Sequence, residues 1–482
     1  MHDTLPPFPL WSFREDVFVE PDPDQGVIVV HSRWEDTVLP MPAPAVVEAM
    51  RRMSLGPISL GNVIRSGAER RDLGALLDRL GHLVVRSFGV DREQPLISVV
   101  PLTPQAAFHL PERPPVNPVR LSRFAVLTTD GGNYLLESPL SHHRVILHRA
   151  DALGHLGTLM RPGPASAAGP ETRSVISYLM AAGMVVEAVT GDPFQRVEFA
   201  EDHDPALTAW TPIDLMFHTR STLGRHDQDF GVTYPLGEHG SVEPVVKEAA
   251  EGITLPRPSW DDLAADPPFS AVVEAHRPAE TFSEAAMTLT DLGALLYRTA
   301  RVRSLTGSPS TEATATTSDR PHPTSGDCHE LELYAVVDRC AGLARGVYHY
   351  DPYHHRLNPL DGDPDELLVS ANLASAPPVL LMVTARFRRL SWKYNGLGYS
   401  LVLTDAGALV QTLSLVATAL GLAGRRLDGP DIEASAQVFR LDWRTESSVC
   451  GYAVGHARTA SPEDGYPVND AEWPMLAAAL LA

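Results

Sequence analysis

Two stretches in the first half of the chain share one pattern of residues. Residues 26–57 and residues 132–164 each open with a glycine and paired apolar residues, and each closes with Gly-Pro. Residues 72–85 and residues 172–186 then share a second pattern, in which apolar residues at helical spacing lead into a short apolar run typical of a strand. Because self-similarity at a regular spacing indicates a repeated structural unit, we predict a tandem duplication.

Each unit is predicted to run strand, strand, helix, turn, helix, strand, with a wing-like segment after it. This order is typical of a winged-helix fold, and we place the two units in residues 1–112 and 113–200. Three roles stay open for them: docking of a peptide along an exposed strand edge, a structural or dimerising role, and DNA binding. DNA binding is the least favoured, because the second helix of one unit has balanced charge and that of the other is nearly apolar.

Composition limits the class of protein. A hydrophobic content of 44% and a charged content of 21% are ordinary for a soluble globular chain. The net charge of −21 opposes binding to nucleic acid and to anionic membranes. No apolar run reaches the roughly 20 residues that span a bilayer, and the first residues lack the features of a secretory signal. We therefore expect a cytoplasmic protein with no membrane or nucleic-acid partner.

The potential metal ligands of the chain have no metal-binding arrangement. Cys328, Cys340 and Cys450 lack the paired spacing of a zinc site, and the adjacent histidine pairs lack the i, i+4 spacing that places two rings on one helix face. We expect buried thiols and no bound metal.

Two segments differ in character from the folded regions around them. Residues 201–268 are rich in Pro, Asp and His and are predicted to be an irregular connector, in which His218, Arg220, Arg225 and His226 either pin the connector to its neighbour or touch substrate. Residues 304–327 are rich in Ser, Thr and Pro, which predicts a mobile lid or binding loop.

The last part of the chain, residues 269–482, alternates strand and helix patterns. We predict a hairpin within residues 329–360, a buried strand at 377–387, and a long helix at 404–424 that ends on a glycine, followed by a strand at 449–457. Thr404 and Asp405 are both good N-terminal caps for that helix. The pattern predicts an α+β domain around a mixed sheet.

Only two of the 39 basic residues are lysines, Lys247 and Lys393. A desolvated lysine can lose its proton and act as a base, whereas the guanidinium of arginine cannot. Lys393 is therefore either a surface lysine in a loop or a catalytic base. Because neighbours in a regular strand point to opposite faces, Lys393 and Tyr394 can serve one pocket only if this segment turns, which Asn395-Gly396 favours.

Five C-terminal segments resemble, in order, the SagB-type branch of the nitroreductase-like flavoproteins. They are AHRPAETF (275–282), RPHPTSGDCHELELYAVV (320–337), GVYHYDP (346–352), SWKYNG (391–396) and TDAGALVQTLSLVATALGL (404–422). The connector and the two leading units are also similar to the longer members of this branch. The resemblance implies an α+β nitroreductase-like flavoprotein domain behind the two winged-helix-like units.

The same resemblance implies an FMN-dependent dehydrogenase that oxidises thiazolines or oxazolines of a ribosomally made precursor peptide to thiazoles or oxazoles. It further implies a homodimer with the flavin at the subunit interface, and a cyclodehydratase partner that forms the azolines from Cys, Ser or Thr. Lys393 and Tyr394 match the catalytic pair of this branch. The residues implied in cofactor binding are His276, Arg277, Pro278, Ser325, Gly326, Gln411, Arg425, Arg426 and Gly429.

The chain departs from the family pattern at the flavin site. Members open the domain with Arg-Arg-Ser-x-Arg, where this chain has Pro278, which lacks an N–H donor, and Glu280, which repels a phosphate. Asp327 adds a further acid. Three hypotheses therefore stay open: an FMN-dependent azoline dehydrogenase, a flavin-free and catalytically silent peptide-docking or scaffolding partner of an azole-forming complex, and a different flavin reaction such as reduction of a peptide double bond.

Overall fold

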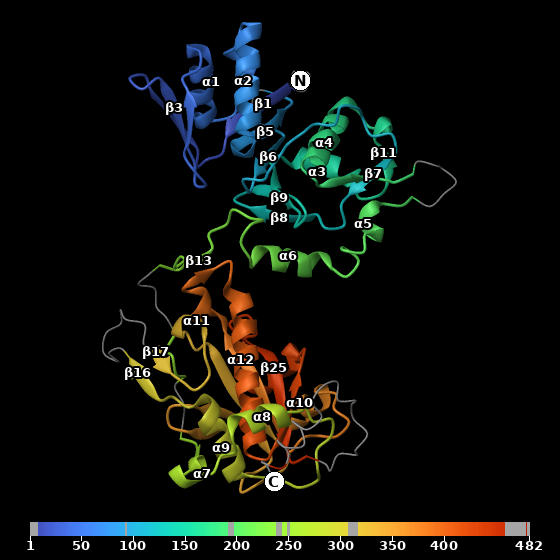
Figure 1. Ribbon diagram of the computed structural model, residues 1–482. Coiled ribbons are helices and arrows are strands. Elements are labelled where there is room, and N and C mark those ends of the chain that lie inside the picture. The colour runs from blue at the N-terminus through green and yellow to red at the C-terminus, as the bar shows by residue number, and fades with distance from the viewer. Residues whose placement is uncertain are drawn as a thin grey trace. The chain divides into compact units, whose positions relative to one another are not determined.

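The computed structural model describes residues 8–91, 94–190, 197–237, 243–247, 251–306 and 317–457, together with residue 479. The chain divides into two compact units, Met1–Gln228 and Asp229–Ala482 (Figure 1). Each unit has its own hydrophobic core and is described separately below. The finer boundaries predicted after residues 112, 200 and 268 stay predictions.

The front half of the first unit packs two helices on a small antiparallel sheet. Its elements are β1 (Phe8–Phe13), β2 (Phe18–Asp22), β3 (Val27–His31), β4 (Thr37–Pro40), α1 (Pro44–Leu55), α2 (Gly67–Arg79), β5 (Val84–Gly89) and β6 (Ile97–Pro101). The order in the small sheet is β2-β3-β4. Ile28 and Val30 of β3 pack with Met50 of α1 and Leu73 of α2, because the apolar positions of each element fall on one face. Ser66 and Glu69 start α2 with a capping box.

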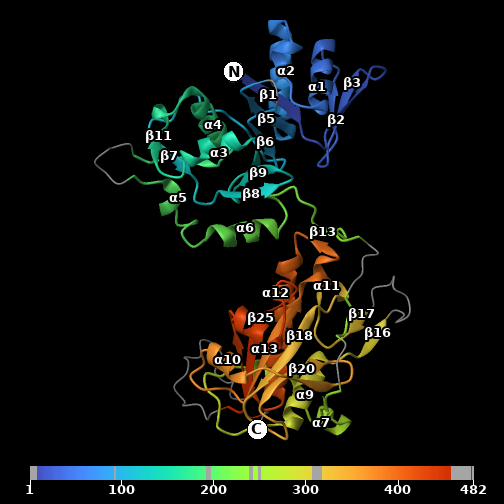
Figure 2. The same cartoon turned by 180° about the vertical axis from the view of Figure 1, so that it is seen from behind.

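The second half of this unit continues the same sheet. Its elements are β7 (Pro118–Leu121), β8 (Val126–Asp130), β9 (Asn133–Glu137), β10 (His143–Leu147), α3 (Ala150–Gly157), β11 (Gly163–Pro164), α4 (Pro170–Ala181), β12 (Val185–Glu187), α5 (Ala200–His203) and α6 (Pro212–Arg220). The larger sheet has the order β1-β5-β6-β10-β9-β8 and so joins the two halves (Figure 2). Both halves follow the predicted strand, strand, helix, helix, strand order, while their assignment as winged helices stays a prediction.

Polar contacts hold the end of the first unit against its sheet. Arg220 donates to Glu137 Oε1 at 3.1 Å, and Arg225 donates to the carbonyl oxygen of Leu140 at 3.3 Å. The ring of His218 stacks on Trp210, with centroids 5.6 Å apart, and His226 Nε2 lies 2.9 Å from the carbonyl oxygen of Thr222. These contacts agree with a pinning role for this part of the connector.

The second unit is built on a seven-stranded sheet. The strands of the whole unit are β13 (Gly231–Val232), β14 (Ile253–Thr254), β15 (Met287–Thr288), β16 (Ser304–Thr306), β17 (Thr317–Asp319), β18 (Leu331–Val337), β19 (Cys340–Ala341), β20 (Gly346–Asp351), β21 (Arg356–Leu360), β22 (Val379–Arg386), β23 (Tyr394–Asn395), β24 (Ala423–Leu427) and β25 (Glu446–Gly455). The order in the large sheet is β14-β21-β20-β18-β22-β25-β24. Every pair of neighbouring strands in this sheet is antiparallel, so the mixed sheet we predicted is wrong. The predicted hairpin and the buried strand β22 are confirmed.

Seven helices among the described residues pack around this sheet. They are α7 (Trp260–Ala264), α8 (Phe269–Ala275), α9 (Leu289–Ala300), α10 (Pro364–Ser370), α11 (Phe387–Ser391), α12 (Gly398–Ala419) and α13 (Ile432–Phe439). In the predicted lid, β16 pairs with β17 and residues 317–327 are held in the domain, while residues 307–316 lie outside the described residues.

The long helix α12 begins at Gly398, earlier than the sequence predicted. Thr404 and Asp405 therefore lie inside the helix, and their predicted role as caps is wrong. Contrary to our expectation, α12 is long and apolar enough to pass a length and composition test for a membrane span. Its buried residues, including Val402, Leu409 and Leu413, belong to the core that packs on the sheet.

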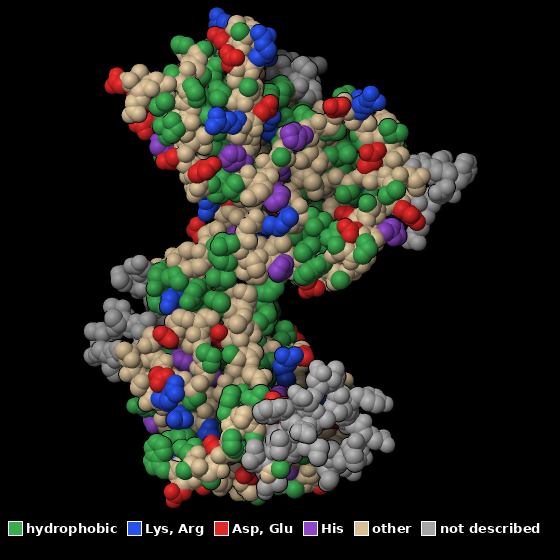
Figure 3. All heavy atoms as spheres, in the orientation of Figure 1, with side chains coloured by type: hydrophobic (Ala, Val, Ile, Leu, Met, Phe, Trp, Pro, Cys, Tyr) green, Lys and Arg blue, Asp and Glu red, His purple; other side chains and the backbone are tan. Residues whose placement is uncertain are grey.

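On the face that Figure 3 shows, Lys and Arg side chains are dispersed among Asp and Glu in both units. This mixture offers no long basic track for a phosphate backbone on that face.

Candidate functional site

Lys393 and Tyr394 lie where the chain leaves α11 and turns toward α12. The backbone oxygen of Lys393 accepts hydrogen bonds from the amides of Thr233 and Tyr234, at 3.2 and 3.3 Å, and β23 pairs with β13 for only two residues. Gly396 then adopts a φ of 72°, which favours glycine. The segment is thus a turn, as the prediction of one shared pocket required.

The side chains of Lys393 and Tyr394 meet at Gly326. Lys393 Nζ donates to the carbonyl oxygen of Gly326 at 3.1 Å and lies 5.7 Å from the centre of the Tyr394 ring. A Cβ placed on Gly326 would overlap Tyr394 Oη and lie 2.7 Å from Lys393 Nζ. Gly326 has a φ of 58°, so both space and backbone geometry favour glycine here.

Asp405 of α12 holds the turn that contains Gly326. Its carboxylate accepts from the backbone amide of Ser325 at 2.7 Å and from Ser325 Oγ at 2.9 Å, and Thr324 Oγ1 lies 3.2 Å from Asp405 Oδ2. Asp405 is only 6% exposed. It serves as a tertiary anchor between α12 and residues 324–326, and both donors of Ser325 are already used by it.

Glu330 lies next to Asp405 with no exposed surface. Its Oε2 lies 3.1 Å from Thr324 Oγ1, whereas its buried Oε1 has no partner among the described residues. Burial, together with the charge of Asp405, raises the pKa of Glu330 to about 7. Glu330 is therefore a carboxyl group that keeps its proton in mildly acidic solution.

The side chains near Lys393 are either uncharged or held by hydrogen bonds. Burial raises the pKa of Tyr394, so its phenol stays protonated and can donate a hydrogen bond. Burial also raises the pKa of Cys328 to about 11, which leaves its thiol unreactive. Arg389 is buried and donates to the carbonyl oxygen of Cys328 at 2.7 Å. A cavity of about 340 Å³ lies beside the loop that contains Gly326, and its lining includes Thr324, Asp327 and His329.

The other predicted cofactor residues form a second group. Ala279 donates its amide to the carbonyl oxygen of Gly424 at 2.8 Å, which places Arg277 and Pro278 beside β24, the strand that carries Arg425 and Arg426. His276 ends α8, and Gly429 follows β24 with a φ of 66°. Gln411 is exposed on the middle of α12.

The two groups lie at opposite ends of the domain. Asp405 and Ala419 are 14 residues apart on α12, about 21 Å at 1.5 Å per residue. The register of the sheet agrees. Gly424 pairs with Val454, near the C-terminal end of β25. Leu331, which follows Glu330, pairs with Ala385, and Ala385 pairs with Ser447 near the start of β25. In Figure 1 α12 runs from the end with β13 and α11 toward α8. One copy of the chain therefore does not bring all the predicted residues together.

The donors of these groups can be compared with what FMN requires. A phosphate needs cations and hydrogen-bond donors, and the second group supplies the guanidinium groups of Arg277, Arg425 and Arg426. Arg426 also pairs with Asp428 at 3.0 Å, on the surface. Arg425 and Arg426 are neighbours in β24 and point to opposite faces of the strand, so Arg277 together with one of them fits the phosphate. Ser325 does not fit as a donor, because both of its hydrogens point to Asp405.

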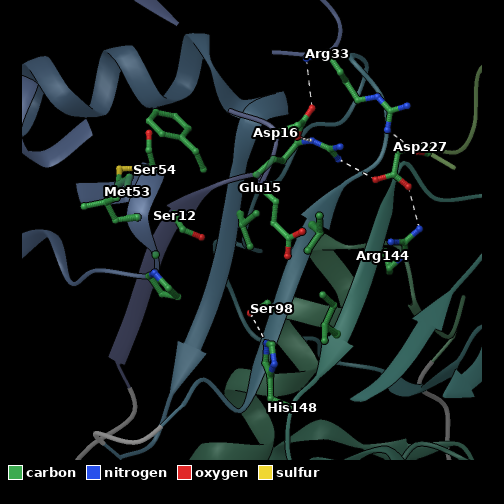
Figure 4. A pocket seen from close by; sticks show the side chains of 18 residues that line it. Ser12, Glu15, Asp16, Arg33, Met53, Ser54, Ser98, Arg144, His148 and Asp227 are labelled. Carbon is green, nitrogen blue, oxygen red and sulfur yellow. Dashed lines mark hydrogen bonds and ion pairs between the residues drawn. The ribbon is translucent and has the colours of Figure 1, made fainter. Parts of the chain in front are cut away.

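The first unit contains a separate cavity of about 570 Å³ (Figure 4). Arg14, Arg33, Arg144 and Asp227 line it, and Asp227 accepts from Arg144 at 2.9 Å and from Arg14 at 3.2 Å. Ser98 Oγ lies 2.8 Å from His148 Nε2 at the other end of the cavity. Its volume suits a small ligand or a short peptide segment, but the arginines that line it are largely neutralised by their own carboxylate partners.

Several of these residues were missed at the sequence level. Glu330, Thr324 and Tyr234 carry no local signal, whereas Asp405 is the one charged residue within α12, and a lone acid in an apolar helix could have indicated a tertiary contact. Tyr234 packs edge-on against Trp392 with centroids 5.1 Å apart, beside the Lys393 backbone. Its contribution required the tertiary structure.

Comparison with known families agrees with this arrangement. Residues 280–456 match the nitroreductase family, and residues 119–227 match the family described as cyanobactin oxidase ThcOx. The first match spans the elements from β15 to β25, which carry Lys393 and its surroundings. The nitroreductase-like α+β fold predicted for the C-terminal region is thereby confirmed.

Three relatives of known name are similar to parts of the chain. A protein named as a nitroreductase from Methanocaldococcus jannaschii is 31% identical over 105 residues, which is 21% of this chain and 53% of that protein. The trifolitoxin-processing protein TfxB of Rhizobium leguminosarum bv. trifolii is 29% identical over 27% of this chain and 38% of its own length. The microcin B17-processing protein McbC of Escherichia coli is 28% identical over 26% of this chain and 50% of its own. The chain thus spans about half or less of each relative.

Solved structures give weaker matches, on which we base no argument. The E. coli microcin synthetase McbBCD complex with truncated pro-MccB17 bound shows 22% identity and a TM-score of 0.33, over 38% of this chain and 70% of that chain. A nitroreductase structure from Anabaena variabilis shows 20% identity and a TM-score of 0.38, over 55% and 53%. The family matches and the two peptide-processing relatives confirm the resemblance stated from the sequence: residues 280–456 match the nitroreductase family, and residues 119–227 before them match the cyanobactin oxidase family.

Proposed function

We propose that this protein is an FMN-dependent dehydrogenase that oxidises thiazolines or oxazolines in a ribosomally made precursor peptide. The observation that carries the proposal is the convergence of the Lys393 amine and the Tyr394 phenol on Gly326. The similarity to TfxB and McbC, both named as peptide-processing proteins, supports a peptide as the substrate.

The chemistry of the reaction assigns roles to these two side chains. Forming an azole removes one hydrogen from Cα and one from Cβ of the azoline. The Cα hydrogen is the more acidic, because it lies between a carbonyl and an imine, and Lys393 Nζ accepts it as a proton. Tyr394 donates a hydrogen bond to the ring nitrogen, and the Gly326 carbonyl keeps the amine directed at the substrate. Bound FMN would supply the acceptor for the second hydrogen, which leaves with its electron pair.

The phosphate of FMN is assigned to Arg277 and to one of Arg425 and Arg426, which point to opposite faces of β24, because guanidinium groups suit a dianion. Pro278 contributes no backbone donor, so its role is to place Arg277 beside β24. His276, Gln411 and Gly429 stay predicted cofactor contacts. Ser325 serves the site by fixing the turn at Gly326, with its hydrogens on Asp405.

A homodimer would complete this site. Along α12 the one charged residue, Asp405, is buried, while Tyr399, Leu403, Gly407 and Gln411 are exposed. A surface this poor in charge suits contact with a second copy of the chain. If two α12 helices pack antiparallel about a twofold axis, the Lys393 end of one copy lies beside the β24 end of the other, which unites the two groups of residues.

A cyclodehydratase that makes the azolines stays an expected partner, and a cytoplasmic location stays an expectation. The alternative is a flavin-free, catalytically silent partner that docks peptide in an azole-forming complex. The acids Glu280 and Asp428 favour this alternative, because each lies near the arginines of the second group and opposes a bound phosphate there. Asp327 adds a further negative charge at the first group.

The two functions differ in a simple measurement. An active dehydrogenase should purify with the visible absorption of a flavin, released on heating, and should remove two hydrogens per ring from an azoline peptide, as followed by mass spectrometry. Lys393→Arg keeps the charge but removes the base, so kcat should fall by about 10² or more while the flavin stays bound. Lys247→Arg is the matched control, because Lys247 serves an ion pair with Glu446 at 2.5 Å, and it should stay active. A colourless protein that FMN cannot reconstitute would support the silent partner instead.

A further inference from the structure

We infer that Glu330 and Asp405 form a carboxyl pair that shares one proton and holds the Ser325–Gly326 turn where Gly326 can orient Lys393. Asp405 is then a positioning residue for the Lys393 amine, and Glu330 makes that positioning depend on pH. The inference rests on the proposed function for the role of Lys393, but not for the existence of the pair.

The first argument comes from the contacts of Asp405. Three donors from two consecutive residues converge on this one carboxylate: Thr324 Oγ1, the Ser325 amide and Ser325 Oγ. Asp405 is fixed on α12, whose neighbouring residues Ala406 and Leu409 belong to the core. The next residue after Ser325 is Gly326, whose carbonyl oxygen accepts from Lys393 at 3.1 Å. The position of the Lys393 amine is thus linked to the core through one carboxylate.

The second argument comes from the number of protons available. Glu330 and Asp405 both lie close to Thr324 Oγ1, which has one hydrogen and can donate to only one of them at a time. Glu330 is fully buried, and its Oε1 has no partner among the described residues. Two ionised carboxylates in this space would repel each other in a low-dielectric interior, so one of them has to keep a proton.

The charges around the pair do not remove this conflict. Arg320 and Arg389 are the nearby cations from neighbouring elements, and they donate to the backbone oxygens of Val245 and Cys328. Arg320 also interacts with the charges of Glu330 and Glu332, yet the pKa of Glu330 is raised despite this cation. Lys393 donates to Gly326, burial keeps Cys328 a neutral thiol, and burial lowers the pKa of His329 to about 2, so its ring is uncharged.

The expected direction of the pH effect follows from the pKa of Glu330, which burial and Asp405 raise to about 7. Below that pH the pair carries one negative charge and keeps its hydrogen bonds to residues 324 and 325. As pH rises through about 7, the second carboxyl ionises and the repulsion loosens the turn. Order in the turn is therefore present in mildly acidic solution and is lost toward pH 8.

Hydrogen exchange of the full-length protein tests the pair without any measure of activity. The Ser325 amide, followed with residue resolution over 324–329 and corrected for the intrinsic effect of pH, should lose protection severalfold between pH 6 and pH 8. Glu330→Gln fixes the neutral state and should abolish this change. Asp405→Asn should lower the protection about tenfold or more at both pH values, because it removes a charge-assisted hydrogen bond.

Asp431→Asn is the matched control. Asp431 also accepts two backbone amides, those of Glu433 and Ala434, but at the start of α13. It should leave residues 324–329 unchanged. The inference is overturned if Glu330→Gln keeps the full pH response, or if Asp405→Asn folds and leaves the Ser325 amide as protected as before. Should Asp405→Asn fail to fold, Glu330→Gln alone decides.

The activity profile separates this inference from the proposed function. In an active enzyme, Glu330→Gln should remove the fall of kcat on the alkaline side of about pH 7 with little change in KM. A protein that binds no flavin but shows the predicted exchange pattern would end the proposed dehydrogenase and leave the carboxyl pair standing. An active enzyme whose exchange pattern does not respond to these variants would end the carboxyl pair and leave the proposed dehydrogenase standing.

Discussion

Gly326 connects the two catalytic candidates at the scale of single residues. Its carbonyl oxygen accepts from Lys393, and its missing side chain leaves the space that Lys393 Nζ and Tyr394 Oη occupy. The positions of the Lys393 amine and the Tyr394 phenol therefore both depend on the turn at Gly326. Lysine at position 393 is suited to this place as a compact ammonium on a flexible stem, whereas a planar guanidinium would need more room.

Gly326→Ala should displace the Lys393 amine and the Tyr394 phenol and reduce turnover by about 10² or more, as expected when a catalytic group is misplaced. The positive φ of 58° also disfavours alanine, at about 1 kcal/mol. Gly421→Ala is the matched control: Gly421 has a φ of 70°, but a Cβ there would have no atom within 4 Å. Equal loss of activity in both variants would show that backbone strain alone is responsible.

At the scale of elements, β24 and α12 divide the candidate site between them. β24 carries two arginines and lies beside Pro278, close to the C-terminal end of α12. Asp405 lies near the N-terminal end of α12. Neither element could form the proposed cofactor site alone, because Arg425 and Arg426 lie at the opposite end of the domain from Lys393.

Replacing both Arg425 and Arg426 by Gln should weaken FMN binding while the protein stays folded. Each charge-assisted hydrogen bond contributes about 1.5 to 3 kcal/mol, so the Kd for FMN should rise by about tenfold or more for each guanidinium group that binds the phosphate. Titration of the apoprotein by flavin fluorescence measures this. Arg444→Gln, which removes an exposed arginine paired only with Asp442 among the described residues, should leave the Kd unchanged. An unchanged Kd in the double variant would contradict the assignment of the phosphate.

At the scale of the whole molecule, the proposed function needs two copies of the chain. The exposed side of α12 is uncharged and the two groups of site residues are about 20 Å apart along it. A dimer through this face would explain both features at once, since it buries apolar surface and brings the groups together.

Leu403→Glu, at a position that is 41% exposed on α12, should convert the dimer to a monomer and release the flavin in the same step. Light scattering coupled to size exclusion, with the flavin absorbance recorded, measures both. Val369→Glu is the control, because Val369 is an exposed aliphatic residue on α10, away from α12. A monomer that keeps its flavin would contradict the shared site.

Local patterns in the sequence predicted much of the second unit. The strand of β22, the hairpin of β18 and β20, the helix of α12 and the turn at Asn395-Gly396 all follow from apolar periodicity and from residues with strong turn preferences. The rarity of lysine narrowed the candidates to Lys247 and Lys393, and the resemblance of SWKYNG to the family pattern selected Lys393. These features are local, so a single chain contains enough information to predict them.

The tertiary structure decided what the local patterns left open. Asp405 has the composition of a helix cap, but it anchors Ser325, 80 positions earlier in the chain, because α12 starts at Gly398 and packs beside the Thr324–Gly326 turn. The sequence motifs assigned Arg425 and Lys393 to one site. In the antiparallel sheet they lie at opposite ends of the domain. Sequence alone determined which residues can do the chemistry. Packing determined which of them meet, because hydrogen bonds between distant residues depend on how helices and strands are placed in space.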